Sequence, residues 1–170
     1  MAIIKKLQGK EPKIGKDVFI AENATIIGDV TIGDACSIWF GTVLRGDVHY
    51  IKIGNEVNIQ DNAVVHGTYK KSPTNIGDRV SIAHGAIIHG CTIHDDVLIG
   101  MNAVILDGAI IESNSIVGMG AVVPKDMIVK SGTVVGGIPA KKIKEIDAEL
   151  LDGEIKRISK SYNMYSSWYK

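Results

Sequence analysis

The feature that most constrains this 170-residue chain is a six-residue period of aliphatic side chains. An α-helix repeats about every 3.6 residues and an alternating strand about every 2, so neither accounts for this period. The aliphatic anchors fall into four runs: Ile14, Ile20, Ile26, Ile32, Ile38 and Leu44; Ile53, Ile59 and Val65; Ile76, Ile82 and Ile88; and Ile93, Ile99, Ile105, Ile111, Val117 and Val123.

A second position and a set of turn residues accompany the anchors. Four residues after most anchors stands a small or β-branched residue, as at Ala24, Cys36 and Ala103. Such a pattern predicts a β-solenoid in which each hexapeptide gives one short strand and three hexapeptides close one triangular coil. Turn formers able to take positive φ lie between these positions, namely Gly15, Asn23, Gly33, Asn55, Asn62, Gly77, Asn102 and Asn114.

The repeat resembles that of the left-handed β-helices, which depart from the usual right-handed crossover. The predicted fold class is an all-β solenoid, a left-handed parallel β-helix with hexapeptide repeats plus a C-terminal α-helix. We expect the β-helix and its caps over residues 1–140 and the helix over residues 141–170. Asp147 can cap this helix. Its apolar stripe, at steps of four and three, is Leu151, Ile155, Ile158, Tyr162, Tyr165 and Tyr169.

Composition narrows the classes of partner. Lys+Arg and Asp+Glu both number 19, so there is no net basic field to attract nucleic acid or an anionic membrane. We find no apolar run of the length that a signal peptide or a bilayer span needs. The two cysteines, Cys36 and Cys91, form no CxxC motif. We therefore expect a cytoplasmic, reduced protein without a nucleic-acid or membrane partner.

The segment from Val64 to Gly90 holds three of the five histidines, and the repeat fixes where two of them lie. Residues three anchors apart stack on successive coils, about 4.7–4.9 Å apart. His66 and His89 each follow an anchor of the same register, and Arg45 follows the anchor one coil earlier. We therefore expect Arg45, His66 and His89 in one outward column, where two imidazoles can converge on a single metal ion.

The third histidine, His84, belongs to the preceding face, beyond a corner of the coil. Five residues of extended chain cover roughly 16 Å, so one prism would hardly bring His84 to a metal held by the column. In a threefold trimer a neighbour's His84 can oppose the column. A lone strand histidine is most often a surface residue, but three in this register predict a metal site between subunits.

The residues around these histidines resemble the γ-class carbonic anhydrases, over nearly the whole chain from Ile14 through the C-terminal helix. The resemblance implies a homotrimer with a zinc ion at each interface, bound by His66 and His89 of one subunit and His84 of the next. It further implies reversible hydration of carbon dioxide to bicarbonate by zinc-bound hydroxide. The matching residues are Arg45-Gly46-Asp47, Asn58-Ile59-Gln60-Asp61-Asn62, His66 and His84-x4-His89.

The same resemblance assigns roles to further residues. Arg45 and Asp47 would pair across the interface, while Gln60 would orient metal-bound solvent. Tyr162 aligns with a tyrosine of the C-terminal helix that reaches the pocket in relatives, and its simpler role is packing on the prism. Imidazole ligands also suit iron and cobalt, so the sequence leaves the native metal open.

Two departures concern proton transfer. Val48 stands where the best-characterised enzymes carry a glutamate, and the loop "GTYKKSPTN" lacks the acidic residue that shuttles protons there. His49, His94 or buffer would have to take over that task.

Two other functions remain open. Hexapeptide β-helices also form acyl-CoA and acetyl-CoA transferases, trimers with one histidine as general base in a cleft between subunits. The segment "GIPAKKIK" resembles their C-terminal ends, but one catalytic base would not explain three histidines at metal spacing. The third possibility is a trimeric assembly protein that binds metal for stability and catalyses nothing.

Overall fold

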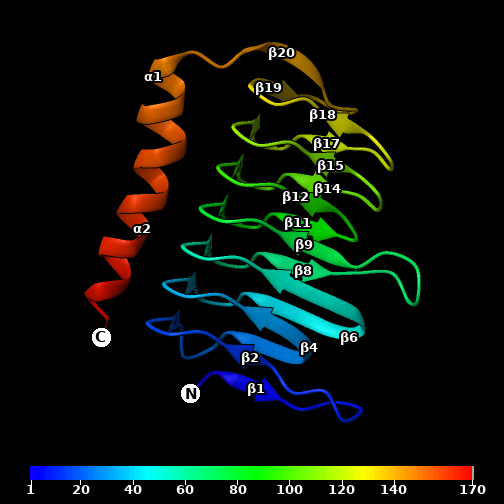
Figure 1. Cartoon of the computed structure of the whole chain (residues 1–170), viewed down its shortest axis with the longest axis vertical. Helices are drawn as coiled ribbons and strands as arrows, with labels where there is room; N and C mark the ends of the chain where they lie inside the picture. The colour runs from blue at the N-terminus through cyan, green and yellow to red at the C-terminus, as the bar shows by residue number, and fades with distance from the viewer. Residues whose placement is uncertain (170) are drawn as a thin grey trace.

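The computed structural model describes residues 1–169, which form a parallel β-solenoid of about 7 turns with one C-terminal helix along its flank (Figure 1). The predicted fold class is confirmed. Most strands have only two or three residues, because each hexapeptide must supply both a strand and a corner.

The coils present three faces, which we name by what lies on them. The histidine face contains β1 (Ile3–Lys5), the first halves of β4 (Thr25–Ile32) and β6 (Val43–Ile53), β8 (Val64–His66), β11 (Ile87–His89), β14 (Val104–Ile105) and β17 (Val122–Val123). The helix face contains β3 (Phe19–Ile20), β5 (Ser37–Ile38), β7 (Asn58–Ile59), β10 (Ser81–Ile82), β13 (Leu98–Ile99), β16 (Ile116–Val117) and β19 (Thr133–Gly136). The open face contains β2 (Lys13–Ile14), the second halves of β4 and β6, β9 (Thr74–Ile76), β12 (Thr92–Ile93), β15 (Ile110–Ile111) and β18 (Ile128–Val129).

Strand register follows the six-residue period. Neighbouring strands on each face are parallel, and Leu44 pairs with Val65 one coil further on. His66 pairs directly with His89, so the predicted stacking of these two positions is confirmed. The long strands β4 and β6 continue around a corner and join the histidine and open faces into one 12-stranded sheet.

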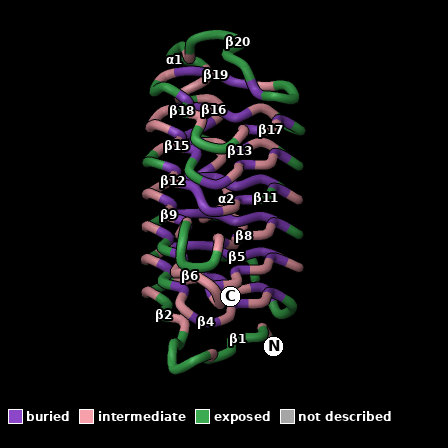
Figure 2. The backbone as a smooth tube through the Cα atoms, turned by 90° about the vertical axis from the view of Figure 1, so that its right-hand side faces the viewer, coloured by how far each residue is buried: buried purple, intermediate pink, exposed green. Residues whose placement is uncertain are grey.

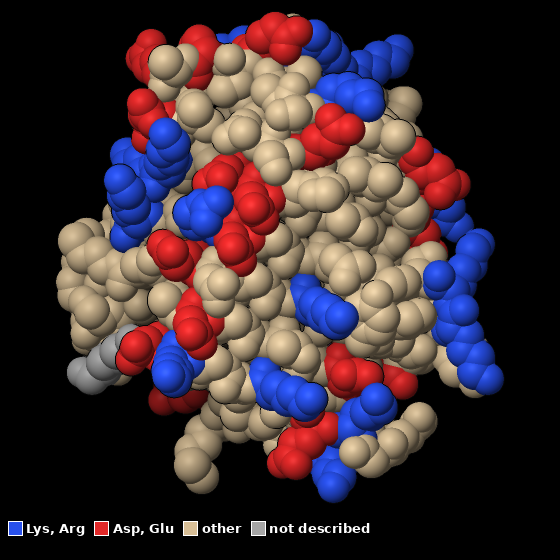
Figure 3. All heavy atoms as spheres, viewed as in Figure 1, with Lys and Arg blue, Asp and Glu red and all other residues tan. Residues whose placement is uncertain are grey.

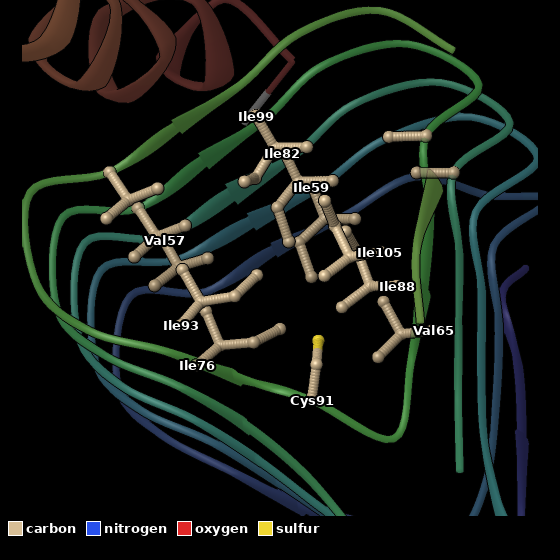
Figure 4. Packing of buried hydrophobic residues seen from close by; sticks show 14 of the residues in the cluster. Val57, Ile59, Val65, Ile76, Ile82, Ile88, Cys91, Ile93, Ile99 and Ile105 are labelled. Atoms are coloured by element: carbon tan, nitrogen blue, oxygen red, sulfur yellow. The ribbon is translucent and has the colours of Figure 1, made fainter. Parts of the chain in front are cut away.

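The anchors fill the interior in ladders, one side chain above the next (Figure 4). Ile59, Ile82 and Ile99 stack on the helix face and are 0% exposed. Burying one such side chain contributes about 1.5–3 kcal/mol, and Figure 2 shows buried residues in coil after coil along the axis. Ile14 departs from the pattern at 38% exposed, because β2 pairs only with β4 and no further coil covers it.

The corners differ in part from the sequence expectation. Asn62 and Asn102 take positive φ as predicted. Gly15, Asn23, Gly33, Asn55 and Gly77 do not; at the corner after Gly33 the positive φ, 54°, falls on Ala35. Glycine is needed at 33 because a Cβ there would lie 2.5 Å from the Gly54 carbonyl oxygen of the next coil.

The C-terminal part closes the solenoid and then returns along it. Strand β20 (Lys141–Glu145) pairs antiparallel with β19. The predicted boundary between a β-helix domain over residues 1–140 and a C-terminal helix over residues 141–170 stays a prediction. A helix follows as α1 (Ala148–Leu150), a π-helical stretch (Leu151–Lys156) and α2 (Arg157–Ser167). Asp147 caps it as predicted, its Oδ1 accepting from the Leu150 N–H at 2.8 Å. The sequence did not indicate the π-helical stretch.

The apolar side of the helix lies against the first coils of the helix face. Trp39 is 6% exposed and contacts Tyr162 and Tyr169, with ring centroids 5.3 and 5.6 Å apart. Phe19 lies 5.1 Å from Trp39 and 5.4 Å from Tyr169. This aromatic cluster, Phe19, Trp39, Phe40, Tyr162, Tyr165 and Tyr169, fixes the end of α2 to the solenoid.

The surface carries charges of both signs. Basic and acidic side chains are interspersed on the side shown in Figure 3, and the two kinds are equal in number over the whole sequence. Within residues 1–169, none of the helices has the length and hydropathy that crossing a bilayer would need.

Candidate metal centre

Two histidines face each other on the outside of the histidine face. Nδ1 of His66 lies 3.2 Å from Nε2 of His89, and the ring centroids are 5.2 Å apart. Zinc binds imidazole nitrogens at about 2.0–2.1 Å in a tetrahedral arrangement, which holds two ligand nitrogens about 3.3 Å apart. The two facing nitrogens therefore have the separation of two ligands of one metal ion.

The other ring nitrogen of each histidine meets a carboxylate. Nε2 of His66 lies 2.8 Å from Oδ1 of Asp47, and Nδ1 of His89 lies 2.6 Å from Oδ1 of Asp107. An ionised carboxylate only accepts hydrogen bonds, so these outer nitrogens carry the protons and the facing nitrogens carry lone pairs. Two lone pairs 3.2 Å apart need a cation or a proton between them. Since metal-binding histidines almost always donate their second N–H in this way, the pair fits a metal.

Asp47 links this pair to Arg45. The guanidinium Nη1 of Arg45 donates to Oδ2 of Asp47 at 2.5 Å within the same chain. Burial pushes the pKa of Asp47 upward, but the hydrogen bonds from His66 and Arg45 outweigh burial and hold the pKa below its ordinary value. Asp47 is therefore ionised at neutral pH. The pairing of Arg45 with Asp47 across subunits stays a prediction.

His84 lies apart from the other two, at the corner after β10. Its Nδ1 is 2.7 Å from Oδ2 of Asp61, and its Nε2 is 3.3 Å from the hydroxyl of Tyr162. Its side chain is 46% exposed, against 15% for His66 and 32% for His89. Burial, with the charge of Asp61, raises the pKa of Tyr162, so the hydroxyl keeps its proton.

No single-chain cluster unites the three histidines. Over the described residues, 1–169, no group of three or more His, Cys, Asp or Glu side chains is placed to hold a metal ion. His66 and His89 supply two nitrogens from one column, and His84 presents Nε2 at a separate corner. A site that uses all three histidines would need a second subunit. The sequence predicts this, because it places His66 and His89 in one column and His84 beyond a corner of the coil.

Gln60 and His84 line one cavity. Its volume is about 310 Å³, and it lies between the helix face and α2 with Tyr162 on its wall. Gln60 is 3% exposed, and its Nε2 donates to Oδ1 of Asn58 at 3.0 Å. Asn58 in turn donates to Ser81 at 2.7 Å. These bonds fix the Gln60 amide and leave its carbonyl oxygen as an acceptor.

Sequence reasoning assigned no carboxylate partner to any of the three histidines, because Asp47 was expected to pair only with Arg45. Asp61 stands inside the motif that suggested the site, yet its contact with His84 was not foreseen. Asp107 follows the position one coil after His89, so counting the column one coil further would have pointed to its neighbourhood. The regular spacing of the repeat was the available signal.

The fold and the site together define a hexapeptide-repeat β-solenoid with carboxylate-held histidines on its outer surface. The family model described as bacterial transferase hexapeptide (six repeats) matches residues 11–46 and 90–125. The chain is 43% identical over 163 residues to a carbonic anhydrase of Geobacillus kaustophilus, covering 96% of this chain and 88% of that protein. The chain belongs to the γ-class carbonic anhydrase-like family of left-handed β-helix proteins.

A further relative and a solved structure are also similar to this chain. Gamma carbonic anhydrase 2, mitochondrial, of Arabidopsis thaliana is 47% identical over 161 residues, which are 92% of this chain and 56% of that protein. The chain thus spans little more than half the length of the first curated relatives it matches. A crystal structure from Bacillus cereus, provisionally described as an acetyltransferase, superposes with a TM-score of 0.96 at 40% identity, covering 99% of this chain and 96% of that one.

Proposed function

We propose that this chain is a metal-dependent γ-class carbonic anhydrase, a homotrimer that interconverts carbon dioxide and bicarbonate at sites between its subunits. The observation that carries the proposal is the pair of facing nitrogens of His66 and His89, 3.2 Å apart, each ring held by a carboxylate. Relatives named carbonic anhydrase, at 43% and 47% identity, support it.

An uncovered aliphatic stripe supports the trimer. The outward residues of the histidine face are aliphatic in five successive coils, and Ile87 among them is 42% exposed. The helix covers the second face. The outward residues of the third are polar from Lys13 to Thr92 and aliphatic only in its last two coils, at Ile110 and Ile128. An exposed apolar stripe beside polar residues is typical of an interface, so we place the second subunit against Val43, Val64, Ile87, Val104 and Val122.

His66 and His89 of one subunit and His84 of the next would hold the metal. Zinc is the expected ion, and iron and cobalt also suit three imidazoles. When bound, zinc would lower the pKa of water to about 7 and so supply a nucleophile for carbon dioxide. The carboxylates of Asp47, Asp61 and Asp107 would keep the three rings oriented, because each already contacts one ring nitrogen.

Gln60 and Tyr162 would form hydrogen bonds with the reacting groups. The carbonyl oxygen of Gln60 can accept the hydrogen bond of the attacking hydroxyl group and turn its lone pair toward carbon dioxide. The Tyr162 hydroxyl lines the same cavity and can donate to a bicarbonate oxygen.

A proton must also leave the site. His49 lines a cavity of about 300 Å³ together with Asp47. His94 instead lines a groove on the open face. Of these two histidines, we therefore assign proton transfer to His49, with buffer as the alternative acceptor.

The test joins three measurements on the purified protein. Sedimentation at micromolar concentration is expected to report three subunits, and metal analysis one ion per subunit. Carbon dioxide hydration, followed by stopped flow after metal is restored, is expected to exceed the buffer rate and to disappear with a chelator. A stable monomer that retains metal would contradict the shared site. A metal-loaded trimer without hydration would leave the assembly protein as the function.

The acyltransferase remains a second candidate, because the matching family model is described as a transferase hexapeptide and the Bacillus cereus structure as an acetyltransferase. Turnover of acetyl-CoA by a metal-free trimer would establish it in place of the anhydrase. The cytoplasmic location stays a prediction; the relative from Arabidopsis thaliana is named as mitochondrial.

A further inference from the structure

The loop that follows His66 is hydrogen-bonded to Asp107, the carboxylate that contacts His89. Thr68 and Ser72 close this loop as an isolated bridge, the Thr68 N–H donating to the Ser72 carbonyl at 2.9 Å. The hydroxyl of Thr68 donates to Oδ2 of Asp107 at 2.5 Å. The other oxygen of Asp107 lies 2.6 Å from Nδ1 of His89. Both oxygens of one carboxylate are thus engaged, one by the loop and one by the imidazole.

Asp107 has little freedom in this position. It is 9% exposed, and burial raises its pKa, but hydrogen bonds from Thr68 and His89 and the charge of Lys125 outweigh burial and keep the pKa below its ordinary value. An ionised carboxylate so far out of water needs both oxygens paired. Without the Thr68 hydroxyl, Oδ2 would lose its partner and the carboxylate could turn away from His89.

The far end of the loop fixes the backbones of both histidine strands. The hydroxyl of Thr74, which is 0% exposed, donates to the His66 carbonyl at 2.5 Å. The hydroxyl oxygen of Thr74 also accepts a hydrogen bond from the Gly90 N–H at 3.0 Å. The same N–H donates to the His66 carbonyl at 3.1 Å. The loop therefore holds one histidine strand through Thr74 and the ring of the other through Thr68.

We infer that the segment of residues 67–74, the loop together with the first residue of β9, is a positioning device in which Thr68, acting through Asp107, fixes the tautomer and orientation of His89. With Nδ1–H directed at Asp107, the lone pair of His89 stays on Nε2, the nitrogen that faces His66. This loop lacks acidic residues, and the inference gives it a task other than proton transfer. The expected effect on metal binding rests on the proposed function, whereas the expected tautomer of His89 does not.

The experiment compares three full-length variants with the wild type. Thr68→Val removes the hydroxyl at nearly constant volume, Thr68→Ser keeps it, and Lys71→Ala changes an exposed side chain of the same loop. In the metal-free proteins, histidine ¹⁵N shifts are expected to show His89 protonated at Nδ1 in all except Thr68→Val. Added cobalt, followed by its visible absorption and by its release to a chelator, should bind Thr68→Val about 10–100-fold more weakly. Thr68→Ser and Lys71→Ala should match the wild type.

An unchanged His89 tautomer together with unchanged cobalt affinity in folded Thr68→Val would overturn the inference. If Thr68→Val does not fold, Asp107→Leu replaces it, since the aliphatic side chain has a similar size and offers His89 no acceptor oxygen. Asp107→Leu with wild-type tautomer and affinity would overturn the inference equally. A wild type that binds cobalt but hydrates no carbon dioxide would refute the proposed function alone. A wild type that binds no cobalt would refute the metal site, and the tautomer measurement would still decide the role of Thr68.

Discussion

The two halves of the candidate centre are built in different ways. His66 and His89 sit on stacked strands, 15% and 32% exposed, and their rings are held by residues of adjoining coils. His84 sits on a corner, 46% exposed, and its Nε2 meets Tyr162 of the C-terminal helix. The column is therefore specified by the period of the solenoid, while the corner half depends on where the helix lies. A trimer would join a rigid half of one subunit to a more accessible half of the next.

The largest expected effect comes from removing one ligand of either half. His84→Ala and His89→Ala should each lose metal at every interface, because all interfaces in a homotrimer lack the same ligand. Refolding the two mutants together should restore one site per mixed trimer. At that interface the His89→Ala chain supplies His84, and a His84→Ala neighbour supplies His66 and His89. Metal analysis of the separated mixed trimers measures the outcome.

Mixing His66→Ala with His89→Ala is the matched control. Both residues lie in one column of one chain, so no arrangement of these two mutants completes a site. Rescue of this mixture, with failure of the first, would show that the halves are divided differently.

The next effect concerns the surface that carries the column. Ile87→Lys would bury a charge without a partner at each interface, which should cost on the order of 3–5 kcal/mol. Analytical ultracentrifugation is expected to show monomers at concentrations where the wild type is trimeric. Asn75→Lys, on the open face, is the control and should stay trimeric. The opposite result would place the interface on the open face.

A comparable or smaller effect is expected from Asp47→Ala. This change leaves Arg45 without its carboxylate and His66 without its proton acceptor. If the pair lies buried between subunits, the trimer should lose on the order of 2–5 kcal/mol and dissociate at higher protein concentration than the wild type. An unchanged dissociation constant would mean that solvent screens the pair.

The smallest effect should come from a change beside His84, in the half of the centre that lies at the corner. Tyr162→Phe removes the hydroxyl that meets His84 at 3.3 Å but keeps the ring against Trp39. In the metal-free protein, where Nε2 of His84 is not a metal ligand, the free energy of unfolding measured in urea should fall by about 0.5–1.5 kcal/mol, the contribution of one hydrogen bond. Metal content should be unchanged, since Asp61 still holds the other nitrogen of His84. Loss of metal would mean that the helix, more than Asp61, positions this ligand.

The sequence was most informative wherever structure repeats. Six-residue spacing was sufficient to predict the solenoid, the buried ladders and the pairing of His66 with His89, because every coil repeats the same geometry. Asp147 could be identified as a cap from its place before an apolar stripe.

What interrupts the repeat could not be predicted in the same way. The Thr68–Asp107 hydrogen bond joins residues 39 positions apart through an irregular loop, and no period indicates it. The π-helical stretch at Leu151–Lys156 and the contact of Asp61 with His84 depend on local packing. The exposure of Ile14 follows from its place at an end, which the anchors alone do not mark.

The return of the helix to the first coils has a consequence for synthesis of the chain. Phe19 and Trp39 are covered by Tyr162 and Tyr169, which leave the ribosome more than a hundred residues later in the sequence. At about 5–20 residues per second, this delay is roughly 6–30 s. Coils can form in order as they emerge, yet an aromatic patch stays open to water throughout. The nascent protein therefore exposes this patch to association with other chains until its C-terminal helix docks.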